Sequence, residues 1–141
     1  MRTGYFMPST LRVCIDEQDD THIEGRIYCK MLDSSLAFHD FNELLLLADK
    51  MFDQKGFPQS YQQKRGFGSQ KGEDSPRFVH NPELYLTDKE MASFGGRIRT
   101  LDILVYTRMY ASWQGAVMEN GKILGRFDSE MGLMKYVQQT R

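Results

Sequence analysis

The feature that most constrains this chain is a similarity between its two ends. Residues 11–25, LRVCIDEQDDTHIEG, align without a gap to residues 101–115, LDILVYTRMYASWQG. Few residues are identical, so the order of features carries the comparison: an alternating strand, a glycine-centred strand, a phenylalanine and an apolar helix. An internal repeat of this kind decides the fold before any local detail does. The matched positions are Leu11 with Leu101, Val13 with Ile103, Ile15 with Val105, Ile23 with Trp113, Gly25 with Gly115 and, after a one-residue shift, Phe38 with Phe127.

Each half has the local pattern of three strands followed by a helix. Apolar and polar residues alternate over 11–16 and again over 23–31, which is the period of half-buried strands. Asp40 followed by Glu43 forms a capping-box pattern that predicts a helix start, and apolar residues then recur at helical spacing as far as Phe52. In the second half Ser129 begins the corresponding helix, for which we expect Met131, Met134 and either Tyr136 or Val137 to face inward.

The hairpin of the second half allows two registers. Asn120 and Gly121 form a strong turn signal, and a two-residue loop would pair Met118 with Ile123 and turn Phe127 away from the apolar face. A three-residue loop would instead pair Trp113 with Phe127 and gather all apolar residues on one face. We therefore expect the three-residue loop. Trp113 is then a packing residue lying across a glycine position, and Gln114 points toward solvent or a partner.

These patterns predict a single α+β domain over residues 1–141. Two pseudo-symmetric βββα repeats, at about 11–53 and 101–139, would form a mainly antiparallel sheet or half-barrel with the helices packed on one face. The length suffices for one core, and the formal net charge of −1 gives no overall attraction to nucleic acid or membranes.

Two short pieces of the chain resemble a small uncharacterised bacterial family. Its members carry a Trp-Gln-Gly strand, which Trp113, Gln114 and Gly115 match. They also carry a Phe-x-Ser-x-x-Glu-Leu helix start, which Phe38, Glu43 and Leu44 match with Asp40 in the serine position; the second half has Phe127 and Ser129 but Gly132 in place of the glutamate. The resemblance implies a bacterial protein and no particular activity.

The connector, about residues 54–100, has no counterpart in the repeat. Thr87 and Glu90 predict a short capped helix within it, and the Gly-rich remainder is typical of a long loop. KRGFG begins like an RNA-recognition core motif, but Ser69, Gln70 and Gly72 break the match. The residues that remain as a candidate interaction surface are Gln114, Tyr61, Lys64, Arg65, Phe67 and Lys71.

Motifs for catalysis, cofactors and metals are missing from the sequence. The histidines His22, His39 and His80 lack metal-ligand spacing, and the acidic run from Asp16 to Asp20 indicates a solvated turn. Cys14 and Cys29 are expected to be reduced, structural thiols. We therefore expect no cofactor and no metal, and we lean against an enzyme.

The surplus of aromatic and methionine side chains favours a non-catalytic protein-interaction or regulatory module that self-associates or binds another protein. A nucleic-acid binder using the basic, aromatic connector is one alternative. A small-ligand protein or enzyme with a pocket between sheet and helices is the other. The N-terminus lacks a signal-peptide pattern and the longest aliphatic run, Leu44 to Leu47, is too short to span a membrane, so we expect a cytoplasmic protein.

Overall fold

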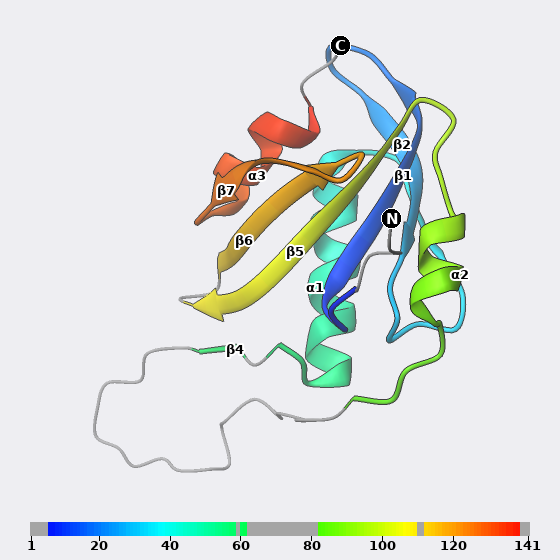
Figure 1. Ribbon diagram of the computed structural model, residues 1–141. Helices are drawn as coiled ribbons and strands as arrows, with labels where there is room; N and C mark the ends of the chain where they lie inside the picture. Colours follow the sequence, from blue (N-terminus) through cyan, green and yellow to red (C-terminus); the bar gives the residue numbers. More distant parts are fainter. Residues whose placement is uncertain (1–5, 59, 62–81, 110–111, 139–141) are drawn as a thin grey trace, which may run out of the picture.

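The computed structural model describes residues 6–58, 60–61, 82–109 and 112–138. Within them the chain is an α+β fold, with six antiparallel strands in the order β3-β2-β1-β5-β6-β7 and three helices (Figure 1). A further two-residue strand, β4, runs parallel to β5. The elements are β1 (Thr10–Gln18), β2 (Ile23–Tyr28), β3 (Leu36–Phe38), α1 (Phe41–Lys55), β4 (Ser60–Tyr61), α2 (Asp88–Ser93), β5 (Arg99–Met109), β6 (Ser112–Glu119), β7 (Lys122–Phe127) and α3 (Glu130–Val137).

One face of the sheet carries the core, and α1 lies against it, behind the strands in Figure 1. Alternate strand residues supply the buried side chains, as the two-residue period predicted. Helix α1 adds its apolar side, and its N-cap Asp40 accepts a hydrogen bond from the Glu43 amide at 2.8 Å. The strand residues of this core are Leu11, Val13, Ile15, Ile23, Ile27, Phe38, Leu101, Ile103, Val105, Trp113, Val117 and Phe127.

Helix α3 begins after Ser129, as expected, and its inward face agrees with the prediction at Val137 and Met134 but not at Met131. Leu133 and Val137 are fully buried, whereas Met131 is 67% exposed. Met134 and Tyr136 are partly buried against the core. The helix has only about two turns, so one row of side chains reaches the sheet and Met131 lies outside it.

Helix α2 belongs to the connector, outside the two βββα repeats whose helices were predicted to pack on one face. This helix is capped by Thr87 and Glu90 as predicted, but it lies on the opposite, outer face of the sheet, beside β1 and β2. There the ring of Phe94 stacks on Tyr28 with 3.8 Å between ring centroids, and the Arg12 guanidinium donates to the Phe94 carbonyl at 2.9 Å. Tyr28 and Arg12 on the outer face of the sheet thus fix Phe94, the residue that follows α2.

The predicted three-residue loop between β6 and β7 is also wrong. Asn120 and Gly121 form a two-residue turn, both with positive φ (53° and 80°), and Glu119 pairs with Lys122. A bulge at Leu124 then shifts the register, so that Phe127 pairs with Gly115 and not with Trp113. The bulge returns Phe127 to the apolar face. The predicted three-residue loop would have placed Phe127 on the same face without a bulge.

Both halves pair their strands in one register at an offset of 90 residues. Ile15 pairs with Gly25 and Val105 pairs with Gly115, and each pair is followed by a one-residue bulge, at Asp16 and Tyr106 respectively. Gly25 also pairs with Phe38, as Gly115 pairs with Phe127. An added Cβ at Gly25 or at Gly115 would collide with a strand carbonyl, of Cys14 or of Leu104.

Candidate functional site

Strand β7 is one of the two outer strands of the sheet, and among the strands of the described residues it carries the single most exposed large apolar side chain. Ile123 is 66% exposed and Leu124 is 38% exposed. The other outer strand, β3, has only three residues. An outer strand presents backbone donors and acceptors on its free side, so a long, apolar one is a place where another chain can pair.

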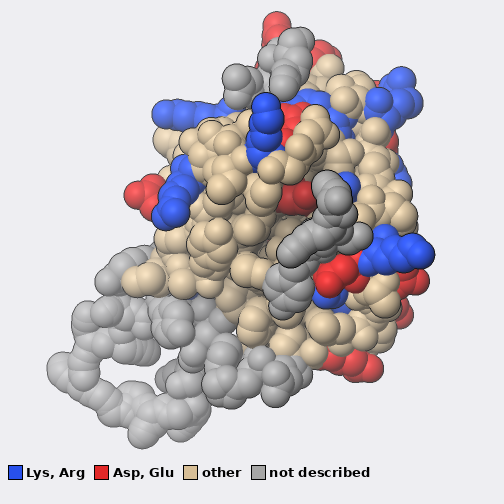
Figure 2. All heavy atoms as spheres, viewed as in Figure 1, with Lys and Arg blue, Asp and Glu red and all other residues tan. Residues whose placement is uncertain are grey.

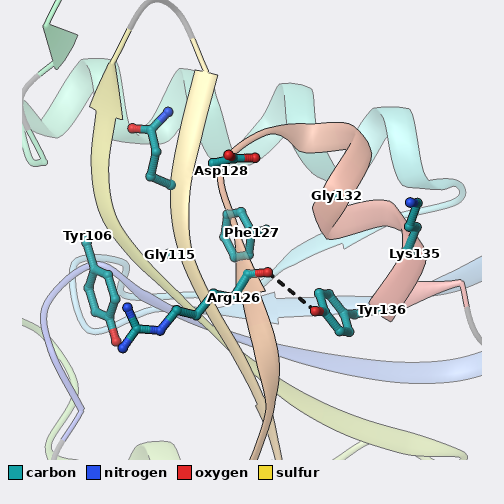
Figure 3. Close-up of a pocket in the computed structure, with 9 residues that line it drawn as sticks. Tyr106, Gly115, Arg126, Phe127, Asp128, Gly132, Lys135 and Tyr136 are labelled. Carbon is teal, nitrogen blue, oxygen red and sulfur yellow. Dashed lines mark hydrogen bonds between the residues drawn. The ribbon is translucent and has the colours of Figure 1, made fainter.

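A hollow of about 620 Å³ borders β7 (Figure 3). Tyr106 and Arg126 lie on one side of the strand, while Lys135 and Tyr136 of α3 lie on the other. The described residues that line the hollow are Tyr106, Gln114, Gly115, Arg126, Phe127, Asp128, Gly132, Lys135 and Tyr136. Two cationic groups, one carboxylate and two phenols suit the binding of polar or anionic groups, and the described residues of the lining include neither a thiol nor an imidazole.

Tyr136 partly covers the free side of β7. Its hydroxyl donates to the Arg126 carbonyl at 3.3 Å, and its ring lies over Gly125, where an added Cβ would collide with the phenol. Because Gly125 has no side chain, the Tyr136 ring can pack directly on the backbone of β7. The hydroxyl hydrogen-bonds a strand carbonyl, so the stretch from Lys122 to Leu124 is the more open part of the edge.

The outer face of β5 and β6 continues this surface. Figure 2 shows that side chains other than Lys, Arg, Asp and Glu cover β6 and the adjoining part of β5, with charged groups around them. Tyr106 is 48% exposed there, and Leu104 and Met118 are half-buried. This face carries an aromatic residue and aliphatic residues next to the β7 edge, which is a suitable composition for a contact surface.

Gln114, predicted to face solvent or a partner, does lie on the side opposite Trp113 and lines the hollow. Its amide is engaged by its own hairpin: the Oε1 atom accepts from the Thr107 hydroxyl at 2.6 Å and from the Met109 amide at 2.9 Å, and Nε2 donates to the Ser112 carbonyl at 3.1 Å. Gln114 thus fixes the end of the β5–β6 hairpin and presents little free hydrogen-bonding capacity.

The other predicted contact residues fall at or beyond the limits of the described structure. Lys64, Arg65, Phe67 and Lys71 lie outside the described residues, and only the backbone of Tyr61 is placed, in β4. The predicted contact surface of the connector therefore lies outside the described residues, apart from the backbone of Tyr61.

Trp113 is a core residue, as the sequence predicted, and does not line the hollow. It is 1% exposed and meets Phe52 edge-on with 5.6 Å between ring centroids. Its indole Nε1 donates to Asp49 of α1 at 2.9 Å. Asp49 also pairs with the buried Arg108 at 3.2 Å, so this polar group ties α1 to the β5–β6 hairpin.

A second group of polar side chains lies at the far end of the β1–β2 hairpin. Ligand atoms of Glu17, His22 and Glu24 all lie within 4.8 Å of one another, which is a spacing that can hold a metal ion. The hydrogen bond with Glu24, supported by the charges of Asp19 and Glu17, raises the pKa of His22. Sequence spacing did not reveal this group because the hairpin, with its bulge, brings Glu17 opposite Glu24.

Sequence analysis also missed the charged lining of the β7 hollow. Arg126 is on β7 whereas Lys135 and Tyr136 are on α3, and no motif joins them. The one available signal was Gly125, a glycine within a strand, which often marks the close approach of another group.

Comparisons of the chain with protein-family models, with curated proteins and with solved structures gave no match. None of the helices in the described residues combines the length and the apolar character that a membrane span requires.

Proposed function

We propose that the protein is a non-catalytic protein-interaction module that self-associates through the free edge of β7. The observation that carries the proposal is the position of Ile123 and Leu124: both are exposed apolar side chains, and both lie on an outer strand of the sheet. Adding a strand to such an edge supplies backbone hydrogen bonds and buries the apolar side chains together.

A second copy of the chain is the occupant that this edge suits best. Two copies related by a twofold axis present the same strand to each other in antiparallel orientation, so one patch serves both partners. If the axis passes between Leu124 and Gly125, Lys122 lies opposite Phe127 and Arg126 lies opposite Ile123. In this register Lys122 and Arg126 do not face a like charge on the partner strand. Like charges directly opposite each other would oppose pairing.

Sedimentation equilibrium over a range of protein concentrations tests the proposal. We expect a monomer–dimer equilibrium that Leu124→Lys weakens by at least about tenfold, or about 1.4 kcal/mol, because the substitution places a charge in the shared strand. Leu46→Lys is the matched control, since Leu46 is 71% exposed but lies on α1. A strictly monomeric wild type, or equal weakening by the two lysines, would contradict self-association at β7.

Tyr136 offers a second variant that acts in the opposite direction. Tyr136→Phe removes the hydroxyl that covers the Arg126 carbonyl and keeps the ring over Gly125. The freed carbonyl becomes available to a partner strand, so association should become tighter. Weaker association of this variant would argue that the tyrosine hydroxyl belongs to the contact surface itself.

We also infer that the two halves of the chain are copies of one βββα unit, at about residues 11–53 and 101–139. The common register, with bulges at Asp16 and Tyr106 and glycines at 25 and 115, supports this origin. The seam supports it too, because Arg12 pairs with Asp102, its own equivalent at the 90-residue offset. A twofold relation between the halves places equivalent residues opposite each other at its centre.

A further inference from the structure

We propose that Glu17, His22 and Glu24, at the end of the β1–β2 hairpin, form a binding site for a divalent first-row transition-metal ion such as Zn²⁺. The three side chains offer one imidazole nitrogen and two carboxylate oxygens, and these atoms lie within 4.8 Å of one another. This site is separate from the β7 edge and does not depend on the proposed self-association.

The strand register accounts for the grouping. After the bulge at Asp16, Glu17 pairs directly with Glu24 across the two strands. His22 directly precedes β2, and its ring nitrogen Nε2 lies 2.8 Å from the Glu24 carboxylate, so both side chains are on the same side of the hairpin. The Asp19 amide donates to the His22 carbonyl at 2.8 Å and the Thr21 amide donates to Asp19 at 2.9 Å, which holds the intervening turn.

The charge of the group favours a cation. Two glutamates placed directly opposite each other destabilise a strand pair, and an ion between them converts that repulsion into attraction. Among the described residues Glu17 forms no ion pair with a lysine or arginine, and Glu24 pairs only with His22, at 2.8 Å. The nearby cation Arg26 is held by Asp16 at 3.0 Å.

The donor set indicates the class of metal. Imidazole with carboxylates suits Zn²⁺ and related ions, whereas Ca²⁺ and Mg²⁺ prefer oxygen donors alone. Zinc lies about 2.0–2.2 Å from nitrogen and oxygen ligands, so two ligands of one ion are at most about 4.4 Å apart. Glu17 is exposed and makes no ion pair with a described lysine or arginine, so a small rotation of its side chain toward the half-buried His22 and Glu24 meets this limit. Three protein ligands leave the remaining positions to water.

Isothermal titration calorimetry of the full chain with ZnCl₂ tests the site. We expect binding of Zn²⁺ but not of Mg²⁺ or Ca²⁺, and weakening by at least about tenfold in His22→Asn and in Glu17→Gln, because each variant removes one of three ligands. His39→Asn is the matched control. His39 lies 3.1 Å from one glutamate, Glu43, whereas His22 lies close to two glutamates. Asp20→Asn keeps the three ligands while removing charge from the same hairpin, and it should bind within about twofold of the wild type.

Each alternative result overturns the proposal. If the wild type does not bind Zn²⁺, or if His22→Asn binds as the wild type does, the three residues do not form a site. If Asp20→Asn loses as much affinity as Glu17→Gln, the attraction is the general charge of the hairpin. Far-ultraviolet circular dichroism of each variant distinguishes loss of ligands from loss of fold.

Discussion

Arg12 and Asp102 are cross-strand partners at the seam between β1 and β5, and their side chains form an ion pair with 3.0 Å between Nη1 and Oδ2. The same guanidinium donates through Nε to the Phe94 carbonyl, so one side chain joins both halves of the sheet to the segment that follows α2. Burial raises the pKa of the Asp102 carboxyl, although Arg12 acts in the opposite direction. The pair is therefore a partly desolvated link at the centre of the molecule.

Replacing Arg12 by methionine should lower the free energy of unfolding by about 1–3 kcal/mol at pH 7, because it leaves the Asp102 carboxylate half-buried without its cation. An acid whose folded-state pKa is raised favours folding below its unfolded pKa, and this contribution is lost as the pH rises through the folded pKa. The deficit of the variant should therefore shrink toward acidic pH. Urea unfolding at pH 7 and pH 4 measures both effects.

The double variant Arg12→Met/Asp102→Leu provides the control for this pair. Removing both charges leaves no unpaired carboxylate, so the double variant should be more stable than Arg12→Met alone. Strict additivity of the two single changes would show that the ion pair itself contributes nothing.

Gly25→Ala and Gly115→Ala should both destabilise the protein by about 2 kcal/mol or more. In each case the added methyl group meets a carbonyl oxygen of the neighbouring strand, which must move for the sheet to form. Gly121→Asn is the control, because nothing lies near its added Cβ and asparagine tolerates its φ of 80°. Thermal denaturation of the three variants should separate the two strand glycines from the turn glycine.

Asp16 should contribute to loss of stability in acid. Its carboxylate accepts hydrogen bonds from Arg26 and from the Arg97 amide, and the Arg26 bond is the main cause of the lowered pKa of this carboxyl. A lowered acid pKa stabilises the fold above the unfolded value of 3.8, and the gain disappears as the pH falls through the folded pKa. Asp16→Asn should cost about 0.5–1 kcal/mol at pH 7, since the pair is one-third exposed, and nothing near pH 2. Equal differences at both pH values would contradict this role.

Both thiols should be unreactive in the folded protein. Burial raises the pKa of Cys14 to about 11 and that of Cys29 to about 12, so neither forms a thiolate near pH 8. A thiol-specific disulfide reagent should label no more than a trace of Cys14 and Cys29 under native conditions and both after unfolding in guanidinium chloride. Rapid labelling of either cysteine at pH 8 without denaturant would show that the buried environment opens.

Local signals in the sequence predicted most of the secondary structure. The starts of α1, α2 and α3 follow from Asp40, Thr87 and Ser129, whose side chains each accept a hydrogen bond from the first turn. Each of these contacts joins residues three positions apart, so a single sequence contains all the information they need. The core strands follow in the same way from alternation of apolar and polar residues.

The hairpin between β6 and β7 shows where local reasoning fails. Asn120-Gly121 correctly indicated the turn. The position of Phe127 on the apolar face was explained by a longer loop, whereas the structure achieves it with a bulge at Leu124. Both solutions bring Phe127 to the same face, so the pattern cannot distinguish them. Contacts that lie outside the hairpin, such as Tyr136 over Gly125, are part of what selects the register.

The sequence by itself determined where strands alternate apolar and polar residues, where the helices start and that Trp113 is a core residue. Only the structure showed that glycine is required at positions 25 and 115, where the neighbouring strand leaves no room for a Cβ. Tertiary structure decided which face α2 covers, because Phe94 meets Tyr28 across 66 positions of the chain. It also decided that Arg126 and Tyr136 line one hollow and that Glu17, His22 and Glu24 share one end of a hairpin. The physical reason is the sequence separation of the interacting residues. Helix propensity and capping depend on residues within one turn, whereas packing brings together residues that are far apart in the sequence.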